Sequence, residues 1–188
     1  MHLDTFAYCA ASQRYAVSRA AGAEPLTSPP MTADAFDAGL LLGRDLLYLA
    51  LHGIPDQPYW YGDHYLTALT VDALQNLNLR KTVVFVASCH FTAGPFLDAL
   101  LACRPRALIA GSGENYARNQ SVVGPHLLGY FLRRSLEAGL PPRLALATAK
   151  YRVQITTNRL KSRAKAKDTR LVEDIQANTD ALQFEVLT

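Results

Sequence analysis

The chain contains little cysteine and no long apolar run. Its 188 residues include three cysteines, an odd number without a CxxC spacing, which argues against a disulfide framework and against a zinc site. No apolar run approaches the roughly 18 residues that a membrane span needs. The first residues carry an early acid and no apolar core, so we expect no secretory signal. These absences favour a reducing, cytoplasmic setting without membrane contact.

Phosphate-binding motifs and internal repeats are also missing. Residues 111–115, GSGEN, lack the Lys-Ser/Thr of a Walker loop and the glycine spacing of GxGxxG. What remains is an ordinary globular composition, with 49% hydrophobic and 19% charged residues. A chain of this length can bury a sizeable core without metal or disulfide help. We therefore expect residues 1–188 to form one domain.

The net charge of +3 is unevenly distributed. Residues 143–170 hold nine Lys or Arg and one acid, which gives +8, so the rest of the chain carries −5. Five basic residues fall along one predicted helix: Arg159, Lys161, Arg163, Lys165 and Lys167. No aromatic residue interleaves them, so we interpret this face as solvated surface. Nucleic-acid binding through it is a third, weaker hypothesis, and it would be strongly salt-dependent.

Apolar runs and capping signals alternate along the chain. Strands are predicted within residues 3–12, 46–53, 82–89, 106–117 and 181–187, the last at a sheet edge. Helices are predicted at 32–43, 70–79, 92–105, 125–139 and from 142 onward. Residues 22–32 are interpreted as a loop, with a very short strand within it as the alternative. The last helix carries an apolar row at Leu144, Thr148, Tyr151 and Ile155. This order predicts an α/β fold, a three-layer αβα sandwich around a mostly parallel sheet.

Two of the predicted strands end in reactive side chains. Residues 46–53 read LLYLALHG and end at His52 and Gly53, whereas residues 82–89 read TVVFVASC and end at Cys89. Continuous aliphatic runs of this length are typical of buried parallel strands. Chemistry in open α/β sheets gathers beyond the carboxyl ends of the strands. We therefore expect the histidine and the cysteine to meet at one edge of the sheet.

A histidine beside a cysteine suits nucleophilic catalysis. His52 would take the thiol proton or polarise the scissile carbonyl, and would later protonate the leaving amine. The backbone amides of Gly53 and Cys89 would form an oxyanion hole. A helix beginning near Pro95 would bring partial positive charge close to the sulfur. The plainer alternatives are a strand-end histidine bonded to a loop and a buried structural cysteine.

The other cysteines and histidines suit these roles less well. Cys103 lies on the apolar row of a predicted helix and Cys9 has no histidine-bearing partner strand, so we assign both to the core. His90 follows Cys89 directly, and in an extended chain the two side chains diverge. His64 lies in the aromatic loop after Gly53, with no pattern that directs it to the site.

Two loops are candidates for substrate binding. Residues 54–65 contain Tyr59, Trp60 and Tyr61 as apolar walls, with Asp56 and Asp63 as acids. Residues 111–115 follow the next strand, and Ser112, Gly113 and Glu114 would border the same crevice. The three acids Asp56, Asp63 and Glu114 hint at a basic side chain in the substrate. A solvated turn is the alternative for residues 111–115.

Taken together, the strand ending in His-Gly, the strand ending in Ser-Cys and the segment ALIAGSG resemble the caspase-like cysteine peptidases, in particular their CHAT domains. The likeness runs from about residue 46 to residue 150 and includes the helix pair in residues 128–151. The resemblance implies a His52–Cys89 dyad, an oxyanion contribution from Gly53, and cleavage of peptide bonds in a protein or peptide substrate without metal or organic cofactor. It also leaves room for activation by a regulatory protein partner.

A function of another class fits the same residues. The chain is alternatively a catalytically silent caspase-like module that binds a protein partner, for example through the aromatic loop. The presence of both His52 and Cys89 favours the enzyme.

Overall fold

A mostly parallel sheet forms the centre of the molecule. The computed structural model describes residues 2–115, 117–163 and 168–187. In this part of the chain the sheet has six strands in the order β2-β1-β3-β7-β8-β9. Their bounds are Thr5–Ala10 (β1), Leu26–Ser28 (β2), Leu46–Ala50 (β3), Val83–Val86 (β7), Ala107–Ala110 (β8) and Glu185–Leu187 (β9). All pairs are parallel except β8 with β9, which confirms the predicted edge strand.

A small antiparallel sheet and five α-helices complete the described architecture. The small sheet joins β4 (His52–Gly53), β5 (Tyr59–Tyr61) and β6 (Thr67–Thr70). The α-helices are α1 (Arg14–Ala21), α2 (Pro95–Ala102), α3 (Pro125–Glu137), α4 (Pro142–Arg163) and α5 (Thr169–Asp180). Short 3-10 helices lie at Ala11–Gln13 (η1), Ala33–Ala35 (η2), Ala38–Leu41 (η3), Asp63–Tyr65 (η4), Asp72–Leu74 (η5), Phe91–Ala93 (η6) and Ala181–Gln183 (η7).

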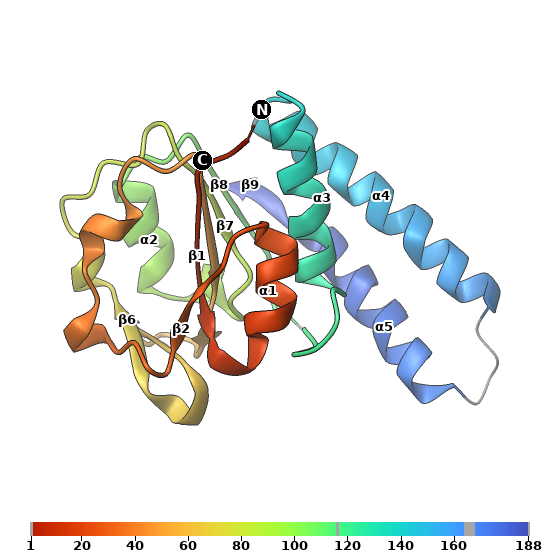
Figure 1. Ribbon diagram of the computed structural model, residues 1–188, viewed down its shortest axis with the longest axis horizontal. Helices are drawn as coiled ribbons and strands as arrows, with labels where there is room; N and C mark the ends of the chain where they lie inside the picture. The colour runs from red at the N-terminus through yellow and green to blue at the C-terminus, as the bar shows by residue number, and fades with distance from the viewer. Residues whose placement is uncertain (1, 116, 164–167, 188) are drawn as a thin grey trace.

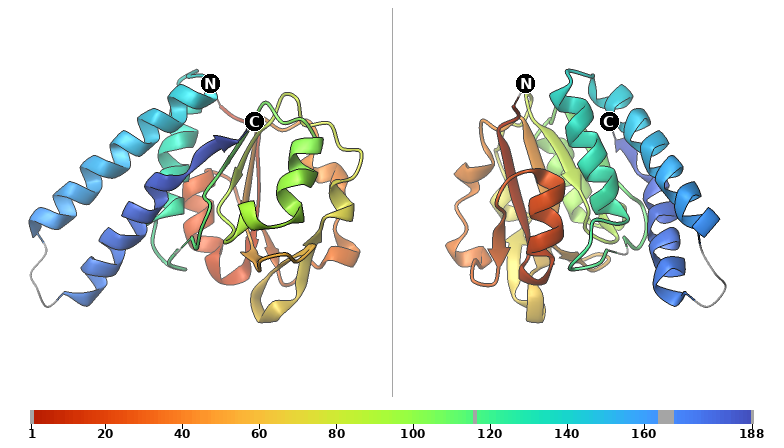
Figure 2. Two further views of the ribbon diagram at one scale, coloured as in Figure 1. Left: turned by 180° about the vertical axis from the view of Figure 1, so that it is seen from behind. Right: turned by 45° about the vertical axis from the view of Figure 1, so that its right-hand side comes forward.

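The sheet has a separate apolar core on each face. Successive side chains of a strand point to opposite faces. In β3, Leu46 and Tyr48 accordingly pack in the core shared with α1, α3 and α4, whereas Leu47 and Leu49 pack in the core shared with α2 and the small sheet. Figures 1 and 2 show these layers, with α2 on one side of the strands and α1 and α3 on the other. The arrangement is compatible with a three-layer sandwich.

Two predicted helices are wrong. Residues 32–43 form only η2 and η3, because the chain is extended at Phe36, whose ring stacks on Tyr8 at 5.1 Å between centroids. Residues 70–79 form only η5, because Asn76 adopts a left-handed conformation with φ of 63°. Asparagine tolerates that conformation better than most residues, which ends the helical pattern early.

The helical hairpin of α4 and α5 differs from expectation in its packing face. Of the predicted apolar row, Leu144 and Tyr151 are exposed. The buried face instead carries Ala145, Leu146, Ala149, Val153 and Thr157, mostly small residues that allow close helix approach. The sequence patterns did not predict α5 or α1. The two helices α4 and α5 lie side by side and extend away from the sheet (Figures 1 and 2).

The basic face of α4 is partly described. Arg159, Lys161 and Arg163 are exposed, whereas Lys165 and Lys167 lie outside the described residues. In the described ranges, no helix has the length and apolar character that crossing a membrane requires.

Candidate active site

His52 and Cys89 occupy matching positions beyond two neighbouring strands. The parallel strands β3 and β7 pair with Leu49 opposite Val86. His52 and Cys89 each follow the residue of that pair by three positions. Because the strands are adjacent and parallel, the two residues leave the sheet at the same edge. The carboxyl ends of β3 and β7 therefore bring the predicted pair to one place.

Gly53 lies against the backbone of Cys89. A Cβ atom added to Gly53 would lie 2.2 Å from the Cys89 carbonyl oxygen, far inside any real contact distance. A residue with a side chain does not fit there unless the backbone moves. Cys89 follows Gly53 by 36 positions in sequence, so this contact joins the two strand ends directly.

An acid lies beside one edge of the His52 ring. Its Nε2 lies 3.6 Å from Oδ1 of Asp63, and 47% of the His52 side chain is exposed. Asp63 is itself fixed by Ser12, whose backbone N–H donates to Oδ2 at 2.7 Å and whose hydroxyl donates to Oδ1 at 2.8 Å. With Nε2 directed to Asp63, Nδ1 is the ring nitrogen that remains for a reacting group.

The Cys89 sulfur is partly buried and accepts a hydrogen bond. The backbone N–H of Asn115 donates to Sγ at 3.3 Å. Burial raises the pKa of the Cys89 thiol, the Asn115 hydrogen bond opposes that rise, and the Glu114 charge adds to it. The net shift is upward, so the thiol is mainly protonated at neutral pH and needs a base. The predicted helix end is further away than expected, because η6 separates Cys89 from α2.

Asn115 also fixes the loop that carries the cysteine. Its side-chain Nδ2 donates to the Ser88 carbonyl at 2.8 Å, and Asn115 is only 6% exposed. The Ser88 hydroxyl in turn accepts from the backbone N–H of Leu51 at 3.2 Å, next to His52. These contacts connect three loops around the sulfur. The sequence analysis did not identify Ser12, Ser88 and Asn115 as site residues. Their contacts are with residues distant in sequence, so no local pattern indicates them.

The backbone around the sulfur leaves a donor available. Within the described residues, no acceptor pairs with the Cys89 backbone N–H, and no hydrogen bond joins the His52 ring to Sγ. An unpaired amide beside a nucleophile can stabilise an oxyanion. Catalytic hydrogen bonds are often long or absent before substrate binds.

Trp60 does not line a substrate surface, which corrects the sequence interpretation. It is 2% exposed, and its ring stacks on Phe96 with centroids 4.1 Å apart and planes 8° apart. Phe91 packs against the same indole at 5.9 Å. Alternation along β5 explains this, because Trp60 faces the core while Tyr59 and Tyr61 face outward. Tyr59 is 41% exposed and Tyr65, in η4, is 77% exposed.

The remaining predicted substrate-binding residues differ in exposure and in contacts. Asp56 is exposed, and its backbone N lies near Gly94 in the segment after Cys89, where an added Cβ would be 3.5 Å away. Glu114 is largely exposed, with Oε1 4.0 Å from His90 Nε2. Ser112 and Gly113 use their carbonyls within the protein, accepting from Thr92 Oγ1 at 3.3 Å and from the His90 N–H at 3.1 Å. Asp63 contacts His52 and Ser12, so it lies beside the predicted base and does not line the outer loop.

The remaining histidines and cysteines stay outside the dyad. His90 takes a left-handed conformation with φ of 52°, so the chain turns there and is not extended as expected. His64 is also left-handed and is exposed. Cys9 and Cys103 are buried, as predicted.

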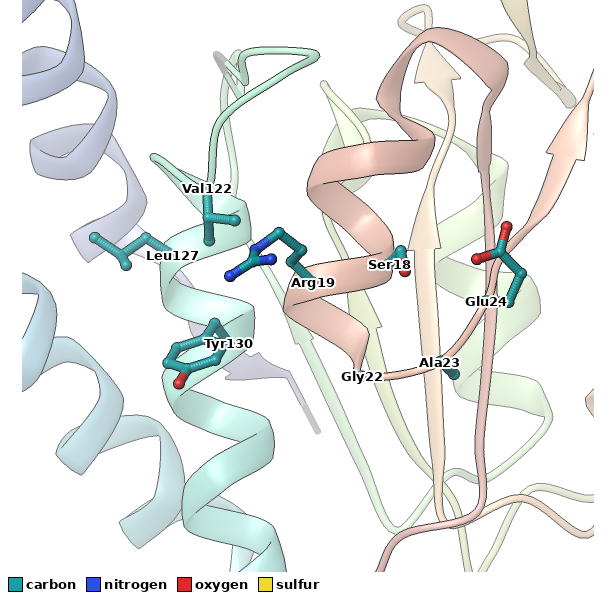
Figure 3. A pocket seen from close by; sticks show the side chains of 8 residues that line it. All are labelled: Ser18, Arg19, Gly22, Ala23, Glu24, Val122, Leu127 and Tyr130. Atoms are coloured by element: carbon teal, nitrogen blue, oxygen red, sulfur yellow. The ribbon is translucent and has the colours of Figure 1, made fainter.

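A separate pocket lies between α1 and α3. Its volume is about 590 Å³, and Figure 3 shows Arg19 extending from α1 toward Val122 and Leu127, with Tyr130 alongside on α3. It contains none of the predicted site residues. The candidate dyad therefore does not share this cavity.

In the part of the chain that the structure describes, no three or more His, Cys, Asp or Glu side chains are grouped so as to hold a metal ion. No family model matches this chain, and no curated protein matches it.

Proposed function

We propose that this chain is a caspase-like cysteine endopeptidase of the CHAT type. His52 Nδ1 takes the Cys89 proton, and the sulfur attacks the scissile carbonyl to form a tetrahedral intermediate. The amides of Gly53 and Cys89 stabilise the oxyanion. His52 then protonates the leaving amine, and water hydrolyses the acyl-enzyme to regenerate the thiol.

The matched placement of His52 and Cys89 carries this proposal. Both residues follow the Leu49–Val86 pair by three positions, and Gly53 touches the Cys89 backbone. The raised pKa of the Cys89 thiol gives the base a defined task, since little thiolate forms without it. Asp63 supplies the third group that orients a base in nucleophile–base pairs.

The substrate that fits best is a polypeptide with a basic residue near the cut bond. Asp56 and Glu114 are exposed acids on loops beside the dyad. Neither forms an ion pair with Lys or Arg in the described residues. Exposed carboxylates without a Lys or Arg partner favour a cationic side chain in the substrate.

A labelling experiment tests the proposal. A thiol-reactive peptidyl probe with Arg or Lys before its reactive group is applied to the wild type and to Cys89→Ala, with labelled residues mapped by mass spectrometry. Cys103, whose thiol is buried and donates to the carbonyls of Leu74 and Ala99, is the internal control. We expect labelling at Cys89 alone, and loss of peptide cleavage in a folded Cys89→Ala protein. Full cleavage by that variant, or equal labelling of both cysteines, would reject the proposal.

One observation favours a second function, a catalytically silent module that binds a protein. Three tyrosine rings form a continuous set beside the dyad, with centroids 6.4 Å apart for Tyr59 and Tyr61 and 6.3 Å apart for Tyr61 and Tyr65. Exposed tyrosines are common binding anchors. Tyr65→Ala separates the two functions: a silent module loses partner binding, whereas the enzyme retains cleavage of a short peptide.

A further inference from the structure

The loop after β8 contacts the candidate nucleophile at its near end. Asn115 donates its backbone N–H to Cys89 Sγ at 3.3 Å and its side-chain amide to the Ser88 carbonyl at 2.8 Å. Both donors belong to one buried residue, so the position of this loop sets the environment of the sulfur. The same loop reaches the outer helices, where Val122 forms one wall of the pocket between α1 and α3 (Figure 3).

The next part of the loop is fixed to α5. Nε of Arg118 lies 2.7 Å from Oδ1 of Asp174, with only 20% of each side chain exposed. Both atoms are buried and form no hydrogen bond, so this contact is an ion pair. The other end of the guanidinium contacts the Glu173 carboxylate and donates to the Arg170 carbonyl at 3.1 Å. Further along, the Gly124 N–H donates to Oδ1 of the buried Asn178 at 2.8 Å.

We propose that Arg118 is a positioning residue for the Cys89 thiol, because its ion pairs with α5 keep Asn115 on the sulfur. Helix α5 thereby becomes an element through which the reactivity of the site is set. The role of Cys89 as nucleophile rests on the proposed function, whereas the reactivity of its thiol is measurable without any peptidase activity.

The direction of the effect follows from the groups that face Cys89. The Asn115 hydrogen bond lowers the pKa of the thiol, and the Glu114 charge, on the same loop, raises it by less. His52, Gly53 and His90 approach from the other loops and do not depend on Arg118. Release of the loop removes both loop contributions at once, and it also lessens the burial of the sulfur, which is the largest cause of the raised pKa. A Glu114→Gln background removes the charge from this balance, so the loss of burial, which lowers the pKa, is opposed only by the loss of the hydrogen bond.

The test is alkylation of Cys89 by iodoacetamide as a function of pH, followed by mass spectrometry, in that background. We expect Arg118→Gln to speed alkylation at pH 7 about tenfold and to move its midpoint to lower pH, because the loss of burial, the largest cause of the raised pKa, outweighs the loss of the hydrogen bond. The matched control is Arg159→Gln, which removes the same charge from an exposed arginine without an ion pair in the described residues. It should leave the profile unchanged.

A second pair of variants keeps the proposal testable if Arg118→Gln folds poorly. The double variant Glu173→Gln with Asp174→Asn breaks the same ion pairs from α5 without altering the loop and should speed alkylation of Cys89 equally. Arg118→Lys, which keeps the charge, should return the rate part of the way to that of the wild type. If the folded Arg118 and Glu173/Asp174 variants alkylate like the control, the positioning role is overturned. If they change the alkylation of Cys89 in a protein that cleaves no peptide, the positioning role is supported and the peptidase proposal is rejected.

Discussion

Oδ1 of Asp63 lies 3.6 Å from Nε2 of His52, and the backbone and hydroxyl of Ser12 fix that carboxylate. Ser12 comes from the turn after β1, 51 positions before Asp63, so two separate parts of the fold place this acid beside the His52 ring. A carboxylate opposite the reacting nitrogen selects the tautomer in which Nδ1 accepts a proton.

Asp63→Asn should therefore reduce kcat about tenfold with little change in KM. The amide keeps the size of the side chain but no longer favours the Nε2–H tautomer, and the half-exposed ring limits the loss. Steady-state cleavage of a short basic peptide measures the effect. Asp34→Asn is the control, because that exposed acid on η2 has no contact with His52 in the described residues and no proposed role in substrate binding. A KM increase without a kcat loss would make Asp63 a substrate ligand, as the sequence alone suggested.

Gly53→Ala should abolish activity and lower stability. Its Cβ would lie 2.2 Å from the Cys89 carbonyl oxygen, so the two strand ends must separate. Overpacking of this kind costs about 1–3 kcal/mol. Gly94→Ala is the matched control, since its Cβ would lie at an ordinary contact distance of 3.5 Å from the Asp56 backbone nitrogen.

Thermal unfolding and peptide cleavage distinguish the possible results for this glycine. Gly62→Ala also clashes, with Ser28 at 2.3 Å, but away from the Gly53–Cys89 contact. A folded Gly62→Ala protein that keeps cleavage, beside an inactive Gly53→Ala protein of similar stability, assigns the loss to the site. Full activity in Gly53→Ala would show that the close approach of Gly53 to the Cys89 backbone is not needed for cleavage.

The parallel core and the pair at its edge were predictable from local sequence. Long aliphatic runs mark β3 and β7, and their shared direction brings His52 and Cys89 to one edge. The supports of the pair were not predictable, because Ser12, Asn115 and Arg118 act across 26 to 55 positions. Trp60 was assigned to the wrong face because residues 54–65 look like a loop in the sequence. Only the strand β5 shows that its side chains alternate between core and surface.

Glu114→Gln should shift the reactivity of Cys89 to lower pH. The carboxylate raises the pKa of the thiol, so removal of its charge lowers that pKa and increases the thiolate fraction at neutral pH. Alkylation rates measured from about pH 6 to about pH 9, the range in which cysteine thiols usually titrate, report the change. The shift should shrink in high salt, since most of the Glu114 side chain is exposed. An unchanged profile at low salt would place Glu114 too far away to matter.

His126 should make folding sensitive to acid. It is fully buried in the first turn of α3, its Nδ1 is 2.9 Å from the Tyr48 hydroxyl, and its Nε2 has no hydrogen-bond partner in the described residues. Burial lowers its pKa from 6.5 to about 4. Between these values the unfolded chain binds a proton that the folded protein does not, so the free energy of unfolding falls as pH decreases from 6.5 to 4.

The loss should reach roughly 3 kcal/mol below pH 4, at 1.36 kcal/mol for each pH unit between the two pKa values. Urea unfolding of the wild type and His126→Leu at pH 7, 5.5 and 4 measures it. The leucine variant should lose stability at pH 7 through the broken Tyr48 contact but show a flatter dependence on pH. His64→Gln, a change at an exposed histidine, should retain the wild-type slope. Equal slopes in His126→Leu and wild type would mean that other groups cause the acid sensitivity.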